Sequence, residues 1–327
     1  MEHQMNLHTD KERFSNAVSV TAEHFHISPA FIEKDYWITQ TLQRMSRNAN
    51  ADKVVFKGGT SLSKAYNLTN RFSEDIDIAV IDAESFTGNQ LKMLIKRLAK
   101  DMADGLEEKS LPGVTSKGSR FYKAVYSYPN VVGAISQAVK TGQLLIEINT
   151  YANPYPYIKC RISSLVADYL IATNRIDIME QYDLLPFEVN VLDKRRTIIE
   201  KLASLLRFSF EEDAVAALQT KVRHFYDLYY LAQDAECNAY LQAAAFPQDL
   251  VELFAHDQQK FDTPQGWLGK SVEDSLLVND FPLLWKGVRF AYQRELQPLS
   301  YSKIPNEKAV FDSFSKIVKQ IKGERIA

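Results

Sequence analysis

Two aspartates that are separated by one residue offer the most distinctive chemistry in this chain. Asp75 and Asp77 lie in the sequence Asp75-Ile76-Asp77-Ile78. Because side chains alternate across a β-strand, both aspartates would project from one face while the isoleucines anchor the other face in a core. Carboxylate oxygens are ligands that hard divalent cations prefer. The spacing therefore predicts that Asp75 and Asp77 bind the same metal ion.

A glycine pair precedes the aspartates and indicates what the metal ion would act on. The sequence Lys57-Gly58-Gly59-Thr60-Ser61 follows the short apolar stretch 53–56. Glycine has no Cβ, so backbone amides at such a turn can approach a polyphosphate closely and adopt unusual φ angles. Thr60 and Ser61 would open a short helix whose first amides face the phosphates, and a hydroxyl can add a contact. The turn and the aspartates together are the arrangement that metal-dependent nucleotidyl transfer requires.

Each half of this arrangement also has an ordinary explanation. A Gly-Gly pair is common in turns, and an Asp-x-Asp sequence can lie on a solvated edge or in an ion-pair network. The order of the two halves favours the functional interpretation, as do Arg71 and Ser73-Glu74 directly before the aspartates. Arg71 is therefore a further candidate for the site.

The same segment resembles the signature of the DNA polymerase β-like nucleotidyltransferase superfamily. KGGTSLSKAY at 57–66, followed by RFSEDIDI at 71–78, is more closely similar to the AbiEii toxin family, which includes the MenT toxins. The resemblance extends from FIEKDYW at 31–37 to the region around Asp227. It implies a bacterial toxin of a toxin–antitoxin or abortive-infection system, with a cognate antitoxin protein as a partner.

The resemblance also gives roles to residues in the second half of the chain. The sequences EKL around Lys201 and RHFYDLYYL around Asp227 resemble the two later motifs of the family. The resemblance implies that Lys201 contacts the phosphates and that Asp227 is a second acidic catalytic residue, able to act as a base on the acceptor hydroxyl. Arg223 lies one turn before Asp227 and would share its helical face, where it could pair with Asp227 or with a phosphate.

Glu147 is a charged residue inside the apolar sequence Leu144-Leu145-Ile146-Glu147-Ile148. Burying a carboxylate without a partner is costly. In a polymerase β-like sheet a neighbouring strand commonly carries a third acidic group, so Glu147 could complete the metal site or orient the acceptor. The alternative is a carboxylate that faces solvent at a strand edge.

Hydrophobic periodicity predicts a mixture of strands and helices up to residue 190, and helices beyond it. The expected strands are 53–56, 75–80, 121–128, 144–150 and 187–191. The expected helices are two within 9–48, divided at Ser28-Pro29, and others at 91–102, 164–173, 194–207, 221–233, 248–256, 283–294 and 306–321. The resemblance implies an α+β fold, with a polymerase β-like nucleotidyltransferase mixed sheet flanked by helices and a helical C-terminal domain. We expect residues 1–190 to form the nucleotidyltransferase core with N-terminal helices, and residues 191–327 to form a helical domain that completes the active-site cleft.

Composition sets wide limits on the class of protein. The 327 residues are 46% hydrophobic, and the formal charge of −2 neither supports nor excludes an RNA partner. The cysteines, Cys160 and Cys237, are far apart, which fits a reducing compartment and argues against structural zinc. The polar N-terminal sequence and the lack of a long apolar run predict a cytoplasmic protein without a membrane segment.

These observations predict an Mg²⁺-dependent nucleotidyltransferase, with Mn²⁺ as an alternative metal and a nucleoside triphosphate as co-substrate. The predicted acceptor is RNA, and the family resemblance favours the 3′ acceptor end of tRNA. The basic run Lys194-Arg195-Arg196 could contact RNA phosphates or be a solvated face. Two alternatives remain open, namely a small-molecule nucleotidyltransferase of the aminoglycoside-modifying type and a catalytically silent partner-binding module.

Overall fold

The structure is a computed structural model that describes residues 5–73, 75–118, 120–133 and 141–324. Internal contacts divide the chain into two units. The first unit comprises Met1–Asn67 and Phe72–Leu192, and the second comprises Leu68–Arg71 and Asp193–Ala327. The division near residue 192 lies close to the predicted boundary at 190, whereas the inclusion of Leu68–Arg71 in the second unit has no counterpart in the sequence analysis.

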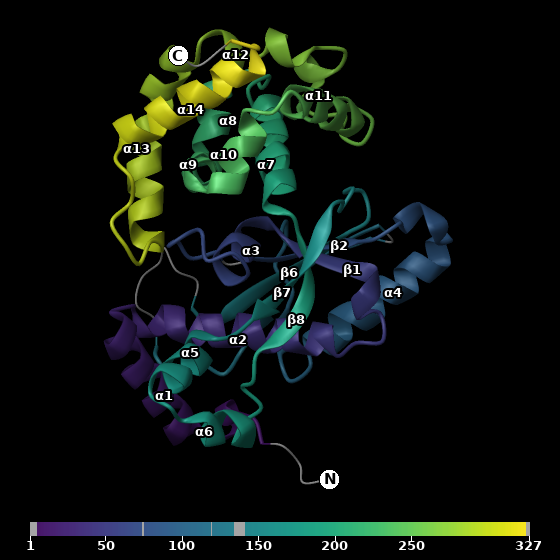
Figure 1. Cartoon of the computed structure of the whole chain (residues 1–327). Coiled ribbons are helices and arrows are strands. Elements are labelled where there is room, and N and C mark those ends of the chain that lie inside the picture. The colour runs from purple at the N-terminus through teal and green to yellow at the C-terminus, as the bar shows by residue number, and fades with distance from the viewer. Residues whose placement is uncertain (1–4, 74, 119, 134–140, 325–327) are drawn as a thin grey trace. The chain divides into compact units, whose positions relative to one another are not determined.

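A mixed β-sheet forms the centre of the first unit (Figure 1). Within the described residues it has eight strands: β1 (Val54–Lys57), β2 (Asp75–Val80), β3 (Glu107–Lys109), β4 (Ser116–Lys117), β5 (Phe121–Ser127), β6 (Gln143–Asn149), β7 (Tyr157–Ile162) and β8 (Phe187–Leu192). The strand order is β3-β5-β6-β2-β1-β8-β7, and β4 pairs with β5. The pairs β2–β6 and β1–β8 are parallel and the other pairs are antiparallel. The predicted α+β fold with a mixed sheet is confirmed.

The alternation of side chains along β2 follows the sequence pattern. Ile76 and Ile78 are fully buried on one face of the strand. Asp75 and Asp77 are half-buried on the other face. Because β2 has β1 on one side and β6 on the other, both aspartates lie in the interior of the sheet and not at its edge. The strand therefore holds both carboxylates on a supported surface.

Helices pack around this sheet in the first unit. They are α1 (Lys11–Phe25), α2 (Pro29–Ser46), α3 (Gly58–Lys64), α4 (Gly88–Met102), α5 (Leu165–Ala172) and α6 (Ile176–Gln181). Helix α2 contacts β6, β8, α4 and α5, so it is the central helix of the unit (Figure 1). It begins at Pro29, as predicted, but the Ser28 side chain forms no capping hydrogen bond. Proline at the first helical position already has a suitable φ and lacks one of the amides that are left without an intrahelical partner at the start of a helix.

The second unit is helical beyond Asp193, as predicted. Its helices are α7 (Lys194–Phe208), α8 (Ala214–Gln219), α9 (Val222–Gln233), α10 (Ala235–Leu241), α11 (Ala245–Gln258), α12 (Leu276–Asn279), α13 (Phe281–Leu296) and α14 (Glu307–Ile321). Aromatic side chains form part of its core, where the Phe225 ring packs against the rings of Trp285 and Phe314 at centroid distances of 5.4 and 4.9 Å. Short 3₁₀ helices across the two units span Leu7–Thr9, Ala51–Lys53, Ala83–Ser85, Gln265–Trp267, Val272–Asp274 and Gln297–Leu299.

None of the helices in the described residues is both long enough and apolar enough to cross a membrane. In the part of the chain that the structure describes, neither cysteine forms a disulfide; Cys160 is half-buried and Cys237 is buried.

Candidate active site

The glycine turn and the Asp-x-Asp strand meet in the first unit. Gly58 has a φ of +81°, a left-handed conformation that side chains rarely adopt. A Cβ built on Gly58 would lie 2.1 Å from Oδ2 of Asp77. That distance is well inside van der Waals contact, so the Asp77 carboxylate occupies the space that any other residue at position 58 would fill. The structure therefore brings together the two halves of the predicted motif.

The turn is braced by its own hydroxyl groups. Helix α3 begins at Gly58, two residues before the predicted start at Thr60. The Thr60 hydroxyl donates a hydrogen bond of 2.5 Å to the backbone oxygen of Asp75, and the Ser61 hydroxyl donates one of 2.8 Å to the backbone oxygen of Gly58. Thr60 and Ser61 are both buried. The Thr60 hydroxyl thus ties α3 to β2, whereas the Ser61 hydroxyl bonds within α3. The predicted contact of these hydroxyls with a phosphate stays a prediction.

A row of four charged residues crosses the sheet at the level of Asp77. Lys57 on β1 is the register partner of Asp77, and Glu147 on the parallel strand β6 is its partner on the other side. Lys123 on β5 is in turn the register partner of Glu147 and forms an ion pair with it at 3.3 Å. Register partners in neighbouring strands share a face of the sheet. Two carboxylates therefore lie side by side in this row, with a lysine at each end.

The position of Glu147 decides between the two interpretations of its strand. Strand β6 lies between β5 and β2, so Glu147 is not at a strand edge and that alternative is wrong. Its side chain is 19% exposed and its charge is balanced by Lys123. Sequence analysis missed Lys123, because the pairing of β5 with β6 cannot be read from the spacing of residues in either strand. A role for Glu147 in metal binding stays a prediction.

The residues on β2 fit a hard divalent cation. In the ranges that the structure describes, no group of three or more His, Cys, Asp or Glu side chains is arranged to hold a metal ion. Asp75 and Asp77 would thus supply two carboxylates and leave the other coordination positions to phosphate oxygens and water. Mg²⁺ commonly binds in this way, through one or two carboxylates together with substrate phosphates and several waters.

Asp227 lies at the centre of a buried ion cluster in the second unit. Its side chain is fully buried. The Arg71 guanidinium donates from Nε to Oδ1 at 2.7 Å and from Nη2 to Oδ2 at 2.6 Å. The Lys201 ammonium lies 2.7 Å from Oδ2. The side chains of Arg71 and Lys201 are only 3% and 7% exposed. The structure thus unites three of the predicted site residues, and Arg71 is the partner of Asp227.

The cluster holds Asp227 in its charged form. Burial by itself would raise the pKa of this carboxyl, but the positive charges of Arg71 and Lys201 outweigh burial and lower the pKa to about 2. A carboxylate with so low a pKa and with both oxygens bonded is a poor acceptor for a proton. The geometry therefore favours an orienting role for Asp227, in which it fixes the Lys201 ammonium, over the base predicted from the sequence. Arg223 is not among the described partners of Asp227, and its contact with a phosphate stays a prediction.

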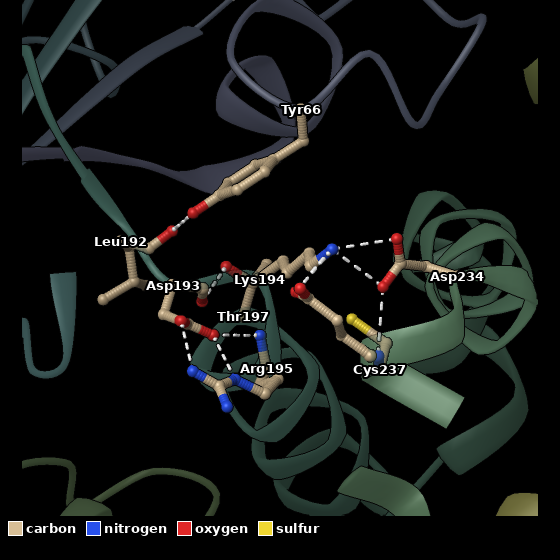
Figure 2. Close-up of polar contacts among 9 residues, drawn as sticks. Tyr66, Leu192, Asp193, Lys194, Arg195, Thr197, Asp234 and Cys237 are labelled. Atoms are coloured by element: carbon tan, nitrogen blue, oxygen red, sulfur yellow. Dashed lines mark hydrogen bonds and ion pairs between the residues drawn. The ribbon is translucent and has the colours of Figure 1, made fainter. Parts of the chain in front are cut away.

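Lys194 and Arg195, the first two residues of α7, form ion pairs (Figure 2). Asp193 caps the helix by accepting from the Arg195 amide at 2.8 Å, and it also accepts from the Arg195 guanidinium at 2.8 and 2.9 Å. Lys194 pairs with Asp234 and Glu236, each at 2.9 Å. Lys194 therefore links α7 to α10, and Arg195 belongs to the cap of α7. A contact of this run with RNA phosphates stays a prediction. The Tyr66 hydroxyl, also in Figure 2, donates to the Leu192 carbonyl at 2.8 Å within the first unit.

The remaining predictions concern three more residues and the expected cleft. Glu74, between Ser73 and Asp75, is outside the described residues. Gly59 lies in the first turn of α3, and Lys57, the last residue of β1, is the register partner of Asp77. The predicted cleft between the sheet and the helical domain stays a prediction.

Comparisons with known proteins bear on the family. The family model described as "Nucleotidyl transferase AbiEii toxin, Type IV TA system" matches residues 40–314. A search of curated proteins gives no match. Among solved structures, the chain is similar to MenT4, a nucleotidyltransferase toxin from Mycobacterium tuberculosis H37Rv, with 16% identity, a TM-score of 0.43, and coverage of 91% of this chain and 98% of that one. Because the family match covers most of the chain and includes the glycine turn, Asp75, Asp77, Lys201 and Asp227, the chain belongs to the AbiEii family of nucleotidyltransferase toxins of type IV toxin–antitoxin systems.

Proposed function

We propose that this nucleotidyltransferase toxin uses Mg²⁺ to transfer a nucleotide from a nucleoside triphosphate to RNA, with the 3′ acceptor end of tRNA as its preferred acceptor. The observation that carries the proposal is the contact between the glycine turn and Asp77, where the Gly58 backbone leaves room for the carboxylate. A phosphate-binding turn and a metal-binding carboxylate must lie this close to act on the same triphosphate. The family gives the reaction class, and the contact gives the residues that would perform it.

Each side chain has a distinct part in the proposal. Asp75 and Asp77 would hold Mg²⁺, or Mn²⁺ in its place, and the bound ion would supply positive charge that offsets the charge of the triphosphate. Backbone amides of Gly58–Ser61 would bind phosphate oxygens at the start of α3. Lys201, oriented by Asp227, would neutralise charge that builds on the phosphates, as the family resemblance implies.

The proposed reaction forms one bond and breaks another at the α-phosphorus. An oxygen of the acceptor hydroxyl attacks the α-phosphorus, and the bond from that phosphorus to the bridging oxygen of the β-phosphate breaks. Pyrophosphate leaves and the hydroxyl proton passes to solvent. The chain positions the reactants and balances their charge, which is the main contribution of proteins to phosphoryl and nucleotidyl transfer.

The acceptor is the part of the proposal that rests on family resemblance. Family members are similar to enzymes that add nucleotides to the 3′ end of tRNA, and a toxin that modified tRNA would stop growth. A toxin of this kind would act in the cytoplasm, where tRNA is, and a cognate antitoxin would be needed to counter it. An assay that offers several acceptors identifies the one that is modified.

The assay offers several acceptors in parallel. Purified protein is incubated with Mg²⁺ and each labelled nucleoside triphosphate in turn, together with total tRNA, other cellular RNA or aminoglycosides. Label that enters tRNA and is lost after removal of the 3′-terminal nucleotide supports the proposal. Label that enters only the aminoglycoside supports the small-molecule alternative, and no label in any acceptor supports the catalytically silent alternative.

A further inference from the structure

Three consecutive charged residues are buried at the start of α2. Glu33, Lys34 and Asp35 are 1%, 1% and 6% exposed. They belong to the segment 31–37, which resembles the family but was given no role by that resemblance. Charged side chains are rarely buried unless they are paired, because the loss of hydration is costly. Each of the three has a partner within the first unit. The Glu33 carboxylate accepts a hydrogen bond of 2.7 Å from the amide of Val131, and the Lys34 ammonium lies 5.7 Å from the centre of the Phe72 ring.

Asp35 has the most extensive set of contacts of the three. Its Oδ1 lies 2.7 Å from the ammonium of Lys64, and its Oδ2 accepts a hydrogen bond of 2.7 Å from the amide of Leu165. The Lys64 ammonium also donates to the backbone oxygen of Ser163 at 2.5 Å. Lys64 is the last residue of α3, and Leu165 is the first residue of α5. The pair therefore ties α2 to the end of α3 and to the start of α5.

This pair secures the end of α3 that is opposite to the glycine turn. At the N-terminal end of α3, the Thr60 hydroxyl donates a hydrogen bond to the backbone oxygen of Asp75, and Gly58 packs on the Asp77 carboxylate. At the other end, Lys64 is held by Asp35 and the carbonyl of Ser163, and the two side chains are only 9% and 8% exposed. A helix of seven residues makes few internal hydrogen bonds, so its position depends on contacts at its ends.

Stability alone is a weak reason for such a pair. The desolvation of two charges offsets most of their attraction, and apolar residues of similar size often replace a buried ion pair without loss of stability. An ion pair differs from an apolar contact in that it fixes direction and distance. The Asp35 carboxylate uses both of its oxygens, one for α3 and one for α5, so it sets the position of α3 with respect to a second element.

We infer that Asp35 and Lys64 are positioning residues, which set the place of the Gly58–Ser61 turn against Asp77 and thereby the binding of the nucleoside triphosphate. The inference rests on the proposed function, because it assigns the turn to the triphosphate. It gives the segment 31–37 a role in binding the donor nucleotide, although none of its side chains needs to touch that nucleotide.

The test compares variants that differ in charge and in stability. Lys64→Met removes the ammonium and keeps most of the aliphatic side chain, and Lys64→Arg keeps the positive charge. The double variant, Lys64→Met with Asp35→Asn, removes both charges, while the Asn oxygen can still accept a hydrogen bond from the Leu165 amide. Arg47→Met is the matched control, since Arg47 follows the other end of α2 and its side chain, which pairs with Asp183, is 58% exposed. For each variant, KM for the nucleoside triphosphate, KM for the acceptor and kcat are measured, together with hydrogen exchange at residues 58–64.

A positioning role predicts a specific split among these measurements. Lys64→Met and the double variant should raise KM for the nucleoside triphosphate by about tenfold, equivalent to about 1.4 kcal/mol, and leave KM for the acceptor unchanged. Exchange at residues 58–64 should become faster in both, while Lys64→Arg should restore part of the lost affinity and Arg47→Met should behave as the parent.

Two other results would contradict the positioning role or the proposed function. If the double variant keeps the parental KM for the nucleoside triphosphate and the parental exchange at residues 58–64, Asp35 and Lys64 do not position the turn. If the parent itself transfers no nucleotide, the proposed function fails, and hydrogen exchange alone then decides whether the pair fixes α3.

Discussion

The buried cluster around Asp227 leads to a prediction with a magnitude that the structure supplies. Asp227→Asn keeps the shape of the side chain and removes its charge. Arg71 and Lys201 would then stay buried, at 3% and 7% exposure, and would lose the negative charge of Asp227. Removing one partner of a buried ion pair typically costs about 3–5 kcal/mol. We expect the free energy of unfolding to fall by at least about 3 kcal/mol on that basis.

The pH dependence of stability gives a second, independent magnitude. The pKa of Asp227 is lowered from 3.8 to about 2, so the folded state binds the proton more weakly than the unfolded state does. The stabilisation is therefore complete above pH 4 and is lost as the pH falls toward 2. A shift of nearly two units corresponds to about 2 kcal/mol. Asn cannot titrate, so the parent should lose about this much more stability than the variant over this range.

Urea denaturation at several pH values measures both quantities. Asp312→Asn is the matched control, because the side chains of Asp312 and its partner Lys308 are 49% and 81% exposed and such pairs contribute about 0–1 kcal/mol. The reasoning is refuted if Asp227→Asn costs no more than Asp312→Asn. It is also refuted if the difference between the parent and Asp227→Asn stays constant between pH 5 and pH 2.

Three further predictions concern the site. Gly58→Ala should lower kcat/KM by about 100-fold or more, since the new Cβ would lie 2.1 Å from the Asp77 carboxylate. Gly88→Ala is the control and should keep the parental kcat/KM, because nothing lies within 4 Å of its Cβ. Equal steady-state kinetics for the two variants would contradict the close approach of Gly58 to Asp77. Lys201→Met should reduce nucleotide transfer but destabilise less than Asp227→Asn in urea denaturation, because Arg71 still balances Asp227; a larger loss of stability would show that Lys201 is mainly structural. Glu147→Gln and Lys123→Met should shift the Mg²⁺ concentration for half-maximal transfer by less than about threefold, since Glu147 is already paired with Lys123. Asp75→Asn should shift this concentration by more than about tenfold. A tenfold shift in Glu147→Gln would instead make Glu147 a metal ligand.

The sequence predicted the elements that depend on local pattern. The alternation Asp75-Ile76-Asp77-Ile78 appears as β2 with the predicted bounds, because one face of the strand must be buried and the pattern specifies which one. The apolar stripes between 194 and 321 appear as helices for the same reason. Strand β7 was not among the expected strands, because it directly follows Pro154 and Pro156, and proline disfavours a strand.

Pairings between distant residues could not be predicted from local pattern. The partner of Asp227 is Arg71, 156 residues away in the sequence, although Arg223 at helical spacing looked the better candidate. The partner of Glu147 is Lys123, which is set by the register of β5 on β6. The role of Asp35 depends on three elements that meet at one point. Each of these contacts arises from tertiary packing, and packing decides which of several charged neighbours becomes the partner.

The most direct test of the central claim is the transfer of labelled nucleotide to tRNA by the parent, by Asp77→Asn and by the control Asp82→Asn, an exposed aspartate of the same unit. Asp77→Asn has nearly the same size and should remain folded, but it should lose at least about 100-fold in kcat, while Asp82→Asn should match the parent. Parental transfer by Asp77→Asn would contradict the account, since catalysis would then not depend on the carboxylate that lies against the glycine turn.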